Sequence, residues 1–419
     1  MRKVESLIVG AGISGLTYAD FCGEDYLIVE KADVPGGLCR TFYEGEYVWD
    51  CAGHFFHFSD EKFKRFFEKK IDKSELVSCR KNTKIFYNNL LIDYPFQMNI
   101  HQLPKDEFID CLYDLFNRDE KSEYGSFQEM LYGKFGRSIT EKFLKPYNEK
   151  LYACDLNILD TDAMGRFFPY ANVSDIVKNF RQNNVSTYND YFEYPKRGAE
   201  TFVNALMENV DSSRLLLGCE LKKIDTRSHI AEAGDEIICY DKLISTIPLN
   251  DFISLEGLEE FSDILPGLHS NTVLVFNMGF DKKSDIDDIH WIYFPDKKFN
   301  FYRVGFYDNI LGSDKLSIYV EIGFDSSQKI DVRSQLEMTL SGLKKSGIIT
   351  DHRLVDYNTL IIPNAYVHIT AESKRLVKDT EENLRDKDIY ITGRYGKWTY
   401  CSIEDCMMQA VRLAEKYNL

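Results

Sequence analysis

A glycine-rich turn near the amino terminus constrains the fold of this chain more than any other feature. Residues 10–15 read GAGISG, a G-x-G-x-x-G pattern between an apolar run at 4–9 and a short helical pattern. A second apolar run at 26–29 ends at Glu30. Strand, glycine turn, helix, strand and acid therefore follow one another in the order of a Rossmann βαβ unit.

Each glycine of this turn has its own physical task. Gly10 permits the tight turn, Gly12 lets the backbone approach a pyrophosphate, and Gly15 lets the helix pack closely on the strand. The pyrophosphate would lie at the helix N-terminus, where unpaired N–H groups and the helix dipole favour an anion. Glu30 is placed to accept a hydrogen bond from a ribose hydroxyl. The segment predicts a dinucleotide-binding site.

The residues after the second strand indicate which dinucleotide is bound. The stretch KADVPGGLCRT places Gly36, Gly37 and Arg40 directly after the acidic strand end. This resembles the second fingerprint of the glutathione-reductase-like flavoproteins, in which paired glycines and an arginine approach FAD. FAD is therefore the expected cofactor and NAD the less natural one. The alternative is a surface turn with a solvated arginine.

Composition narrows the remaining classes of protein. A chain of 419 residues is too long for one ordinary core, so two or three domains are expected. A net charge of −16 argues against nucleic acid or an anionic membrane as the main partner. The sequence contains no long apolar run, so neither a membrane span nor a secretory signal is expected. Ten cysteines without a C-x-x-C pair fit reduced thiols in a cytoplasmic protein.

The pattern of apolar residues predicts interleaved elements rather than separate modules. Helices are expected within 60–80 and 105–190, strands within 213–247 and 272–325, and a closing helix over 403–417. The expected fold class is α/β, a Rossmann-like FAD-binding domain with a helical insertion and an antiparallel-sheet domain. The FAD-binding domain is assigned to 1–80, 190–250 and 370–419, the helical domain to 100–189, and the antiparallel-sheet domain to 81–99 and 251–369.

Seven separated segments resemble the UDP-galactopyranose mutase family, particularly its eukaryotic-type branch. In chain order the segments are DCAGHFFHF (50–58), YPFQMNI (94–100), FLKPYNEKLYA (143–153), HWIYFP (290–295), FYRVGFYDN (301–309), AYVHIT (365–370) and GRYGKWTY (393–400). Their common order is more specific than any one motif. Related flavin amine oxidases share the FAD fingerprints, but YPFQ-x-NI and PYN-x-K-x-(W/Y)-A are not expected in them.

The resemblance implies an isomerase that interconverts UDP-galactopyranose and UDP-galactofuranose. In this family N5 of reduced FAD attacks the anomeric carbon and displaces UDP, and the sugar recloses with a different ring size. Such activity belongs to the biosynthesis of polysaccharides, including lipopolysaccharide, in the cytoplasm. With only one G-x-G-x-x-G, NAD(P)H would have to reduce the flavin within the sugar cleft itself. The oligomeric state is left open.

The resemblance also implies roles for residues of this sequence. Arg303 matches the diphosphate arginine, and three tyrosines match phenols around the same phosphates. The implied catalytic set is His54, Tyr293, Arg303, Tyr366 and Tyr400. The implied substrate-binding set is Gln97, Asn148, Tyr152 (in place of a tryptophan) and Arg166 (with its register shifted by one). The further cofactor-binding residues are Gly53, His54, Arg394 and Ser402.

The histidine pair at 54 and 57 has several interpretations. A metal site is not expected, because no third ligand is spaced nearby. Gly53 and His54 match a loop on the face of the flavin, so His54 is assigned to flavin contact without proton transfer, and His57 to packing. The N-terminus of the closing helix, with Ser402 as its cap, is expected to face the flavin and favour its reduced, anionic state.

Two departures from the family pattern leave the substrate open. A family tyrosine is replaced by Ile310, and an N-x-D motif reads Ser402-Ile403-Glu404. UDP-galactose remains the leading substrate, with N-acetylated, deoxy or dTDP-linked sugars as alternatives. An FAD-dependent amine oxidase or a protoporphyrinogen-oxidase-like desaturase is the competing function. Taken singly, Arg303 could be a strand-face salt-bridge partner, and a tyrosine is more often structural than catalytic.

Overall fold

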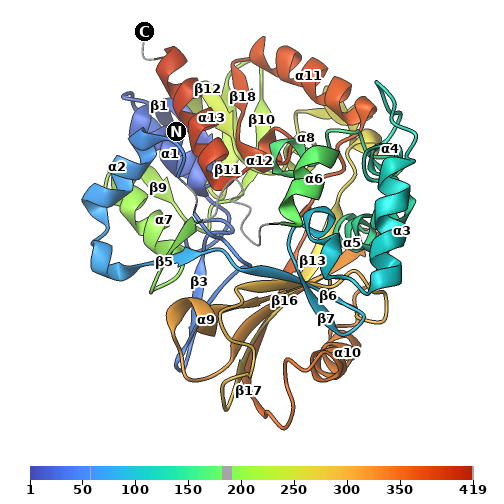
Figure 1. The fold of residues 1–419 in the computed structure, drawn as a ribbon. Coiled ribbons are helices and arrows are strands. Elements are labelled where there is room, and N and C mark those ends of the chain that lie inside the picture. Colours follow the sequence, from blue (N-terminus) through green and yellow to red (C-terminus); the bar gives the residue numbers. More distant parts are fainter. Residues whose placement is uncertain (57, 182–190, 418–419) are drawn as a thin grey trace.

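The computed structural model describes residues 1–56, 58–181 and 191–417 as a mixed α/β fold, which confirms the expected class (Figure 1). A mainly parallel sheet and its helices fill the upper part of this view, and a second, mainly antiparallel sheet fills the lower part. Helices α3 to α6 lie between them on the right. Segments far apart in sequence thus share each layer.

The first sheet is built on β1 (Arg2–Val9), which pairs in parallel with β2 (Tyr26–Val29) and β12 (Glu236–Ser245). Its other strands are β9 (Leu215–Leu216), β10 (Leu221–Asp225), β11 (Ile230–Ala233) and β18 (Ile389–Ile391). Within the predicted strand region 213–247, β12 is continuous because β1 pairs with it along Ile238–Ser245. The first half of β12 also pairs with β11 and the second half with β18.

Helices cover this sheet and complete a Rossmann layer. The helix after the glycine turn, α1 (Ile13–Phe21), packs against α7 (Glu200–Met207) and α13 (Ile403–Tyr417). The closing helix has the bounds that the sequence pattern predicts, 403–417. A shared apolar core joins these helices to α2 (Glu61–Lys70). On another side α11 (Ala371–Arg385) packs on β18.

The second sheet has seven strands in the described part of the chain. Their order is β17 (Leu354–Ile362), β13 (Asn271–Phe280), β16 (Ser317–Asp325), β15 (Arg303–Phe306), β14 (Trp291–Tyr293), β6 (Thr83–Tyr87) and β7 (Leu90–Asp93). Neighbours are antiparallel except β14 and β6. The predicted strand region 272–325 therefore joins a much earlier hairpin. The short α9 (Tyr307–Leu311) and the longer α10 (Val332–Lys345) accompany this sheet.

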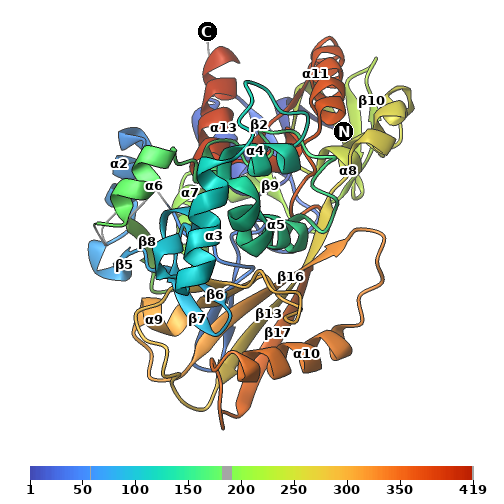
Figure 2. The same cartoon turned by 45° about the vertical axis from the view of Figure 1, so that its right-hand side comes forward.

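The helical group comes forward in Figure 2. It contains α3 (Lys105–Phe116), α4 (Phe127–Ile139), a π-helical turn (Thr140–Leu144), α5 (Lys145–Tyr152) and α6 (Val173–Asn179). Local chemistry sets its boundaries: Ser126 accepts a hydrogen bond from Glu129 N and begins α4, and Ala153 in the left-handed conformation ends α5. Residues 182–190, the end of the predicted helical stretch, lie outside the described residues.

The remaining elements are short. The strands are β3 (Thr41–Glu44), β4 (Tyr47–Asp50), β5 (Leu76–Arg80) and β8 (Tyr191–Pro195), and the helices are α8 (Leu249–Ile253) and α12 (Gly393–Gly396). Single 3₁₀ segments occur at Lys73–Glu75, Phe96–Met98, Ile100–Gln102, Gly165–Phe167, Ser212–Arg214 and Glu259–Gly267. The helical prediction for 60–80 is wrong after residue 70, because LVSCR pairs with β8 as a strand.

Candidate active site

The glycine turn lies at the carboxyl end of β1, where it leads into α1. Gly10 has φ +101°, and a methyl group added there would lie 2.5 Å from Thr246 Oγ1. A methyl group on Gly15 would lie 2.0 Å from the Gly10 carbonyl oxygen. Gly12 is the N-cap of α1 and supplies no side-chain cap. The first N–H groups of this helix are therefore left for another acceptor, such as a phosphate.

The second glycine pair packs directly on this turn. Gly36 N donates to the Ala11 carbonyl oxygen at 2.8 Å, and a methyl group on Gly37 would lie 3.3 Å from Gly12 Cα. Arg40 Nε donates to the Gly37 carbonyl oxygen at 2.8 Å. The two motifs, separate in sequence, form a single backbone cradle that side chains would fill.

Glu30 stands beside the cradle at the end of β2. Its carboxylate accepts hydrogen bonds from Ala11 N at 2.8 Å and from Ala32 N at 2.9 Å. An ionised carboxylate has about four acceptor positions, so a ribose hydroxyl can still be bound. A cradle without Cβ atoms, an uncapped helix N-terminus and an adjacent acid together fit the adenosine diphosphate part of a dinucleotide.

Arg303, on β15, is held by a buried carboxylate on the next strand. Its Nη2 donates to both carboxylate oxygens of Glu321, at 2.5 and 2.7 Å, and Tyr302 Oη donates to the same group at 2.6 Å. Its guanidinium lies 5.8 Å from the centre of the Tyr319 ring. The salt-bridge interpretation of Arg303 is therefore correct, and its Nε has no partner within the described residues.

A second arginine lies among the predicted tyrosines. The Arg394 guanidinium carbon is 4.6 Å from the Tyr400 ring centre and 5.2 Å from that of Tyr366. These two rings stack at 5.9 Å with an interplanar angle of 21°. Arg394 Nη2 donates to the Ala365 carbonyl oxygen at 2.9 Å, and no carboxylate pairs with this arginine among residues 1–56, 58–181 and 191–417.

The two arginines belong to one electrostatic group. Burial raises the pKa of Tyr366, and the charges of both Arg303 and Arg394 oppose that rise. Tyr293, two positions after Trp291 on β14, accepts a hydrogen bond from the indole Nε1 at 3.1 Å. We call Tyr293, Arg303, Tyr366, Arg394 and Tyr400 the arginine–tyrosine cluster; each is partly exposed.

His54 faces this cluster from the loop after β4. Burial lowers its pKa to about 4, and the neighbouring charges include Glu321, Arg394 and Arg303. Its Nδ1 lies 3.1 Å from the Ala52 carbonyl oxygen. The imidazole is therefore neutral at pH 7. His57 lies outside the described residues.

Gly53 lets this loop approach the second sheet. A methyl group at Gly53 would lie 2.3 Å from Tyr319 Oη and 2.8 Å from the Phe55 ring. Because Tyr319 also lies under the Arg303 guanidinium, the glycine brings the histidine loop against β16, the strand whose Glu321 binds Arg303.

Two predicted substrate-binding residues, Gln97 and Asn148, are buried beside or within the helical group. Gln97 Nε2 donates to the Pro169 carbonyl oxygen at 2.5 Å, and Asn148 Nδ2 donates to that of Leu144 at 2.6 Å. The amide oxygens of both side chains lack partners in the described part of the chain. Each side chain is 2% exposed or less, so two buried acceptors remain unsatisfied.

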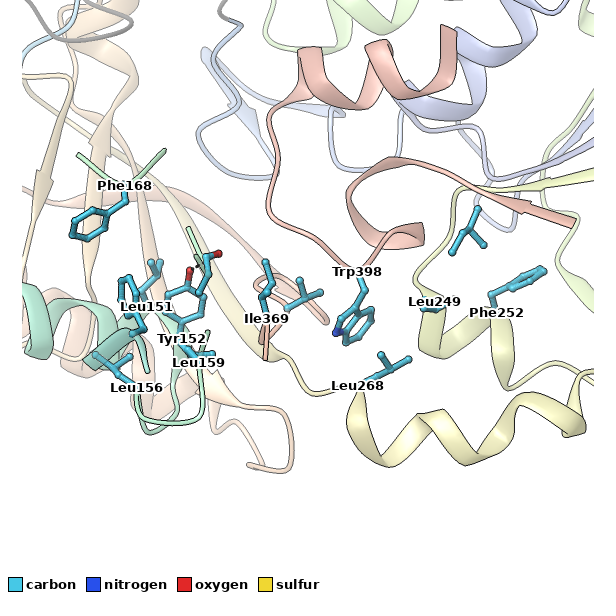
Figure 3. Close-up of a cluster of buried hydrophobic side chains, with 14 of the residues drawn as sticks. Leu151, Tyr152, Leu156, Leu159, Phe168, Leu249, Phe252, Leu268, Ile369 and Trp398 are labelled. Atoms are coloured by element: carbon cyan, nitrogen blue, oxygen red, sulfur yellow. Dashed lines mark hydrogen bonds between the residues drawn. The ribbon is translucent and has the colours of Figure 1, made fainter. Parts of the chain in front are cut away.

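Tyr152 belongs to an apolar core that continues toward α8 (Figure 3). In this view it lies beside Leu151 and Leu159, while Trp398 packs near Leu268. Only 1% of Tyr152 is exposed, and its ring contacts the Tyr366 ring at 6.0 Å. Tyr152 therefore packs against Tyr366 of the cluster, and its role in substrate binding stays a prediction.

Arg166 and Ser402 make protein contacts in this structure. Arg166 Nη2 bonds to Asp405 Oδ1 at 2.6 Å, with 47% of its side chain exposed. Ser402 and Asp405 form a reciprocal cap: Asp405 N donates to Ser402 Oγ at 3.1 Å, and Ser402 N donates to Asp405 Oδ2 at 2.9 Å. Substrate binding by Arg166 and cofactor binding by Ser402 stay predictions.

A family model described as "Flavin containing amine oxidoreductase" matches residues 22–416. The chain belongs to this family. Its cofactor is FAD, for which the cradle formed by the glycine turn, the second glycine pair and Glu30 is suited.

Solved structures of several enzymes are similar to this member of the family. A reduced UDP-galactopyranose mutase superposes with a TM-score of 0.91 at 23% identity, covering 99% of this chain and 94% of that one. Cyclohexylamine oxidase from Brevibacterium oxydans IH-35A has a TM-score of 0.71 at 11% identity, and the match covers 99% of this chain and 100% of that one. A CLA-producing fatty acid isomerase from P. acnes has a TM-score of 0.70 at 11% identity, and the match covers 99% of each chain. At these identities the likeness establishes the fold.

Sequence reasoning missed the role of Glu321 in this flavoprotein. It is a single carboxylate within the buried strand SIYVEI, and a buried charge needs a partner. That signal could have indicated an arginine nearby, although not which one.

Glu404, noted above only as a departure, also has a definite role. It accepts hydrogen bonds from Ser59 N at 2.8 Å and Asp60 N at 2.7 Å, and so ties α13 to the histidine loop. Ile310 is 3% exposed in an apolar core, so no phenol replaces the missing family tyrosine at that position.

Other surface features of this flavoprotein lie away from the cluster. A hollow of about 380 Å³ between α3 and α4 is lined by residues of mixed charge and contains none of the predicted site residues. Within the described residues, no three His, Cys, Asp or Glu side chains are grouped to hold a metal. In the same residues, no helix is both long and apolar enough to span a bilayer.

Proposed function

We propose that this flavoprotein interconverts the pyranose and furanose forms of a UDP-sugar, with UDP-galactose as the leading substrate. The observation that carries the proposal is the arginine–tyrosine cluster, in which two cations and three phenols share one partly exposed surface. Guanidinium and phenol groups are the donors that hold a departing diphosphate while negative charge builds on it.

The charge balance of the cluster favours an anionic ligand. Glu321 offsets the charge of Arg303, whereas Arg394 has only a carbonyl oxygen as its hydrogen-bond acceptor among the described residues. The hydroxyl groups of Tyr366 and Tyr400 have no hydrogen-bond partner there either. A diphosphate would therefore meet one uncompensated cation and two available O–H donors.

The nucleotide would extend toward the helical group. Gln97 and Asn148 each keep an unpaired amide oxygen there, and a uracil ring offers an N–H donor that such an oxygen can accept. Burial of both side chains favours a ligand that satisfies them.

Bound FAD in its reduced state would supply the nucleophile for the anomeric carbon. Arg303 and Arg394 would hold the diphosphate in place so that it can leave and recombine. His54, being neutral, would add no charge beside the cofactor. By resemblance, the proposed setting is nucleotide-sugar supply for surface polysaccharides, in the cytoplasm, with NAD(P)H as a candidate reductant.

An FAD-dependent amine oxidase is the competing function, since the family includes such enzymes by name. The stacked pair Tyr366 and Tyr400 resembles an aromatic cage for a cation. However, Arg394 already lies over both rings, and a second cation would be repelled by its charge. The arginine therefore favours the mutase over the oxidase.

The test is turnover by the purified holoprotein under anaerobic conditions. After reduction with dithionite, UDP-galactofuranose and UDP-galactopyranose are expected to interconvert, as followed by chromatography. The oxidised protein should show no exchange. If an amine bleaches the oxidised flavin while the reduced protein leaves both UDP-sugars unchanged, the oxidase replaces the mutase as the function.

A further inference from the structure

Two cysteines meet at the start of α13, beside the arginine–tyrosine cluster. Cys401 Sγ and Cys406 Sγ are 3.6 Å apart, and both residues are partly exposed. Ser402 is the N-cap residue between them, as its bonds with Asp405 show. Cys401 and Cys406 therefore occupy the positions at which two apolar side chains commonly pack to fix the chain entering a helix. This arrangement is called a hydrophobic staple. Here, both of its positions hold a cysteine.

The surroundings favour the thiolate form of Cys406 over that of Cys401. Cys406 lies near the backbone N–H of Arg394, the guanidinium of the same residue, and Ser14 on α1. The pKa of Cys406 is lowered by its contact with Cys401 and by the N–H of Arg394. The pKa of Cys401 is raised by its contact with Cys406 and by burial. A thiolate near a helix N-terminus and a cation is the reactive form of cysteine.

We propose that Cys401 and Cys406 form a thiol–disulfide modification site, which low-molecular-weight disulfides oxidise to an intramolecular bond. Closing the bond requires the two sulfur atoms to approach by roughly 1.5 Å, to the usual S–S distance. The proposal rests on the sulfur geometry and the helix staple, and is independent of the substrate.

The exchange is balanced by the disulfide that enters. The Cys406 thiolate attacks one sulfur of glutathione disulfide, forms a mixed disulfide and releases one glutathione. The Cys401 sulfur then attacks Cys406 Sγ and releases the second glutathione. Two protein thiols are oxidised by two electrons, and one glutathione disulfide is reduced to two thiols. The covalent staple then joins Cys401, next to Tyr400, to the first turn of α13.

The experiment treats the purified holoprotein with glutathione disulfide, alkylates the remaining thiols, and maps peptides by mass spectrometry. The wild type is expected to lose the Cys401 and Cys406 thiols together, as one peptide lighter by two hydrogens and without glutathione. C401S should retain one glutathione on Cys406, because the resolving thiol is gone. C406S should leave Cys401 unmodified.

Cys154 provides the matched control, because it is also partly exposed but burial raises its pKa to about 12. C154S should form the Cys401–Cys406 bond as the wild type does. The proposal is overturned if wild-type Cys401 and Cys406 remain alkylated as free thiols, or if glutathione persists on wild-type Cys406. It is also overturned if Cys154 is modified at a comparable rate. The wild-type measurement decides the matter even if a serine variant fails to fold.

Discussion

At the scale of single residues, Arg303 and Glu321 show how one contact serves both stability and the proposed site. The carboxylate is 1% exposed and accepts hydrogen bonds from Arg303 and Tyr302. Without the arginine it would be a buried charge with one phenolic partner. With the arginine, it fixes the guanidinium on the face that also carries Tyr293.

Replacing Arg303 by alanine should weaken UDP binding and leave the flavin spectrum intact. A charge-assisted hydrogen bond contributes about 1.5–3 kcal/mol, so the Kd for UDP is expected to rise about 10- to 150-fold. Calorimetric titration of the holoprotein measures this. R353A is the matched control. The Arg353 side chain is 80% exposed, and its ion pair with Asp281 is long, at 3.7 Å. Unchanged UDP affinity in R303A would remove Arg303 from the site.

His54 should make the protein less stable in mild acid. Its pKa is lowered to about 4 in the folded state and is about 6.5 in an unfolded chain. Between these values the unfolded state binds more protons, so the free energy of unfolding falls as the pH falls. Urea unfolding should show that the free energy of unfolding falls less between pH 7 and pH 5 in H54N than in the wild type. An equal fall in both proteins would contradict the inference that His54 is buried as a neutral imidazole.

At the scale of elements, α13 connects three parts of the candidate site. The carboxylate of Asp405 accepts a hydrogen bond from Arg166, and that of Glu404 accepts hydrogen bonds from the histidine loop. Gln409 accepts a hydrogen bond from Gly393 N at 3.1 Å. The helix thus sets the position of Arg394 and of the loop bearing His54 together.

Replacing Glu404 by glutamine should destabilise the protein. A neutral amide oxygen would accept weaker hydrogen bonds from Ser59 N and Asp60 N, and the NH₂ would replace the oxygen that accepts from Ser59 Oγ. The expected cost is about 1–3 kcal/mol of unfolding free energy, measured by urea unfolding. E415Q lies on the same helix, and its acid pairs with Lys62 while 59% exposed, so a change of about 0–1 kcal/mol is expected. Equal effects would contradict the role given to Glu404.

At the scale of the whole molecule, the helical group is fastened to the second sheet by a buried lysine. Lys150, on α5, donates to the carbonyl oxygens of Phe294 at 2.7 Å and Asp296 at 3.2 Å, and also to that of Phe301. These carbonyls belong to the connection between β14 and β15. The same connection leads to Arg303 on β15. The lysine therefore links α5, which carries Asn148 and Tyr152, to the strand that carries Arg303.

Replacing Lys150 by methionine should therefore destabilise the protein without changing its flavin cradle. Methionine keeps most of the apolar stem but removes the Lys150 donor from three carbonyl oxygens, of which that of Asp296 keeps the hydrogen bond from Phe299 N. The expected cost is about 1–3 kcal/mol. Thermal unfolding of the holoprotein checks this. K145M, on the same helix, removes only a partly exposed pair with Glu149 at 3.8 Å and should change stability by less than about 1 kcal/mol.

The sequence alone determined the features that depend on neighbours in the chain. The glycine turn, the strand at 26–29 and the closing helix at 403–417 follow from steric freedom, apolar runs and capping, which act within a few residues. The FAD fingerprints are of this kind, and so the cofactor could be predicted. The strand at 76–80 could not, because its pairing partner lies beyond residue 190.

Only the tertiary structure decided which distant side chains meet. Arg303 and Glu321 face each other because β15 and β16 pair in that register, and a slip of one residue would turn either side chain to the opposite face. The sequence pointed to Arg394 as a flavin contact and to Tyr366 and Tyr400 as phosphate contacts. Their stacking depends on how the segments after α12 and after β17 meet, where Arg394 donates to the Ala365 carbonyl oxygen. Register and packing are set by the whole core, which no local pattern specifies.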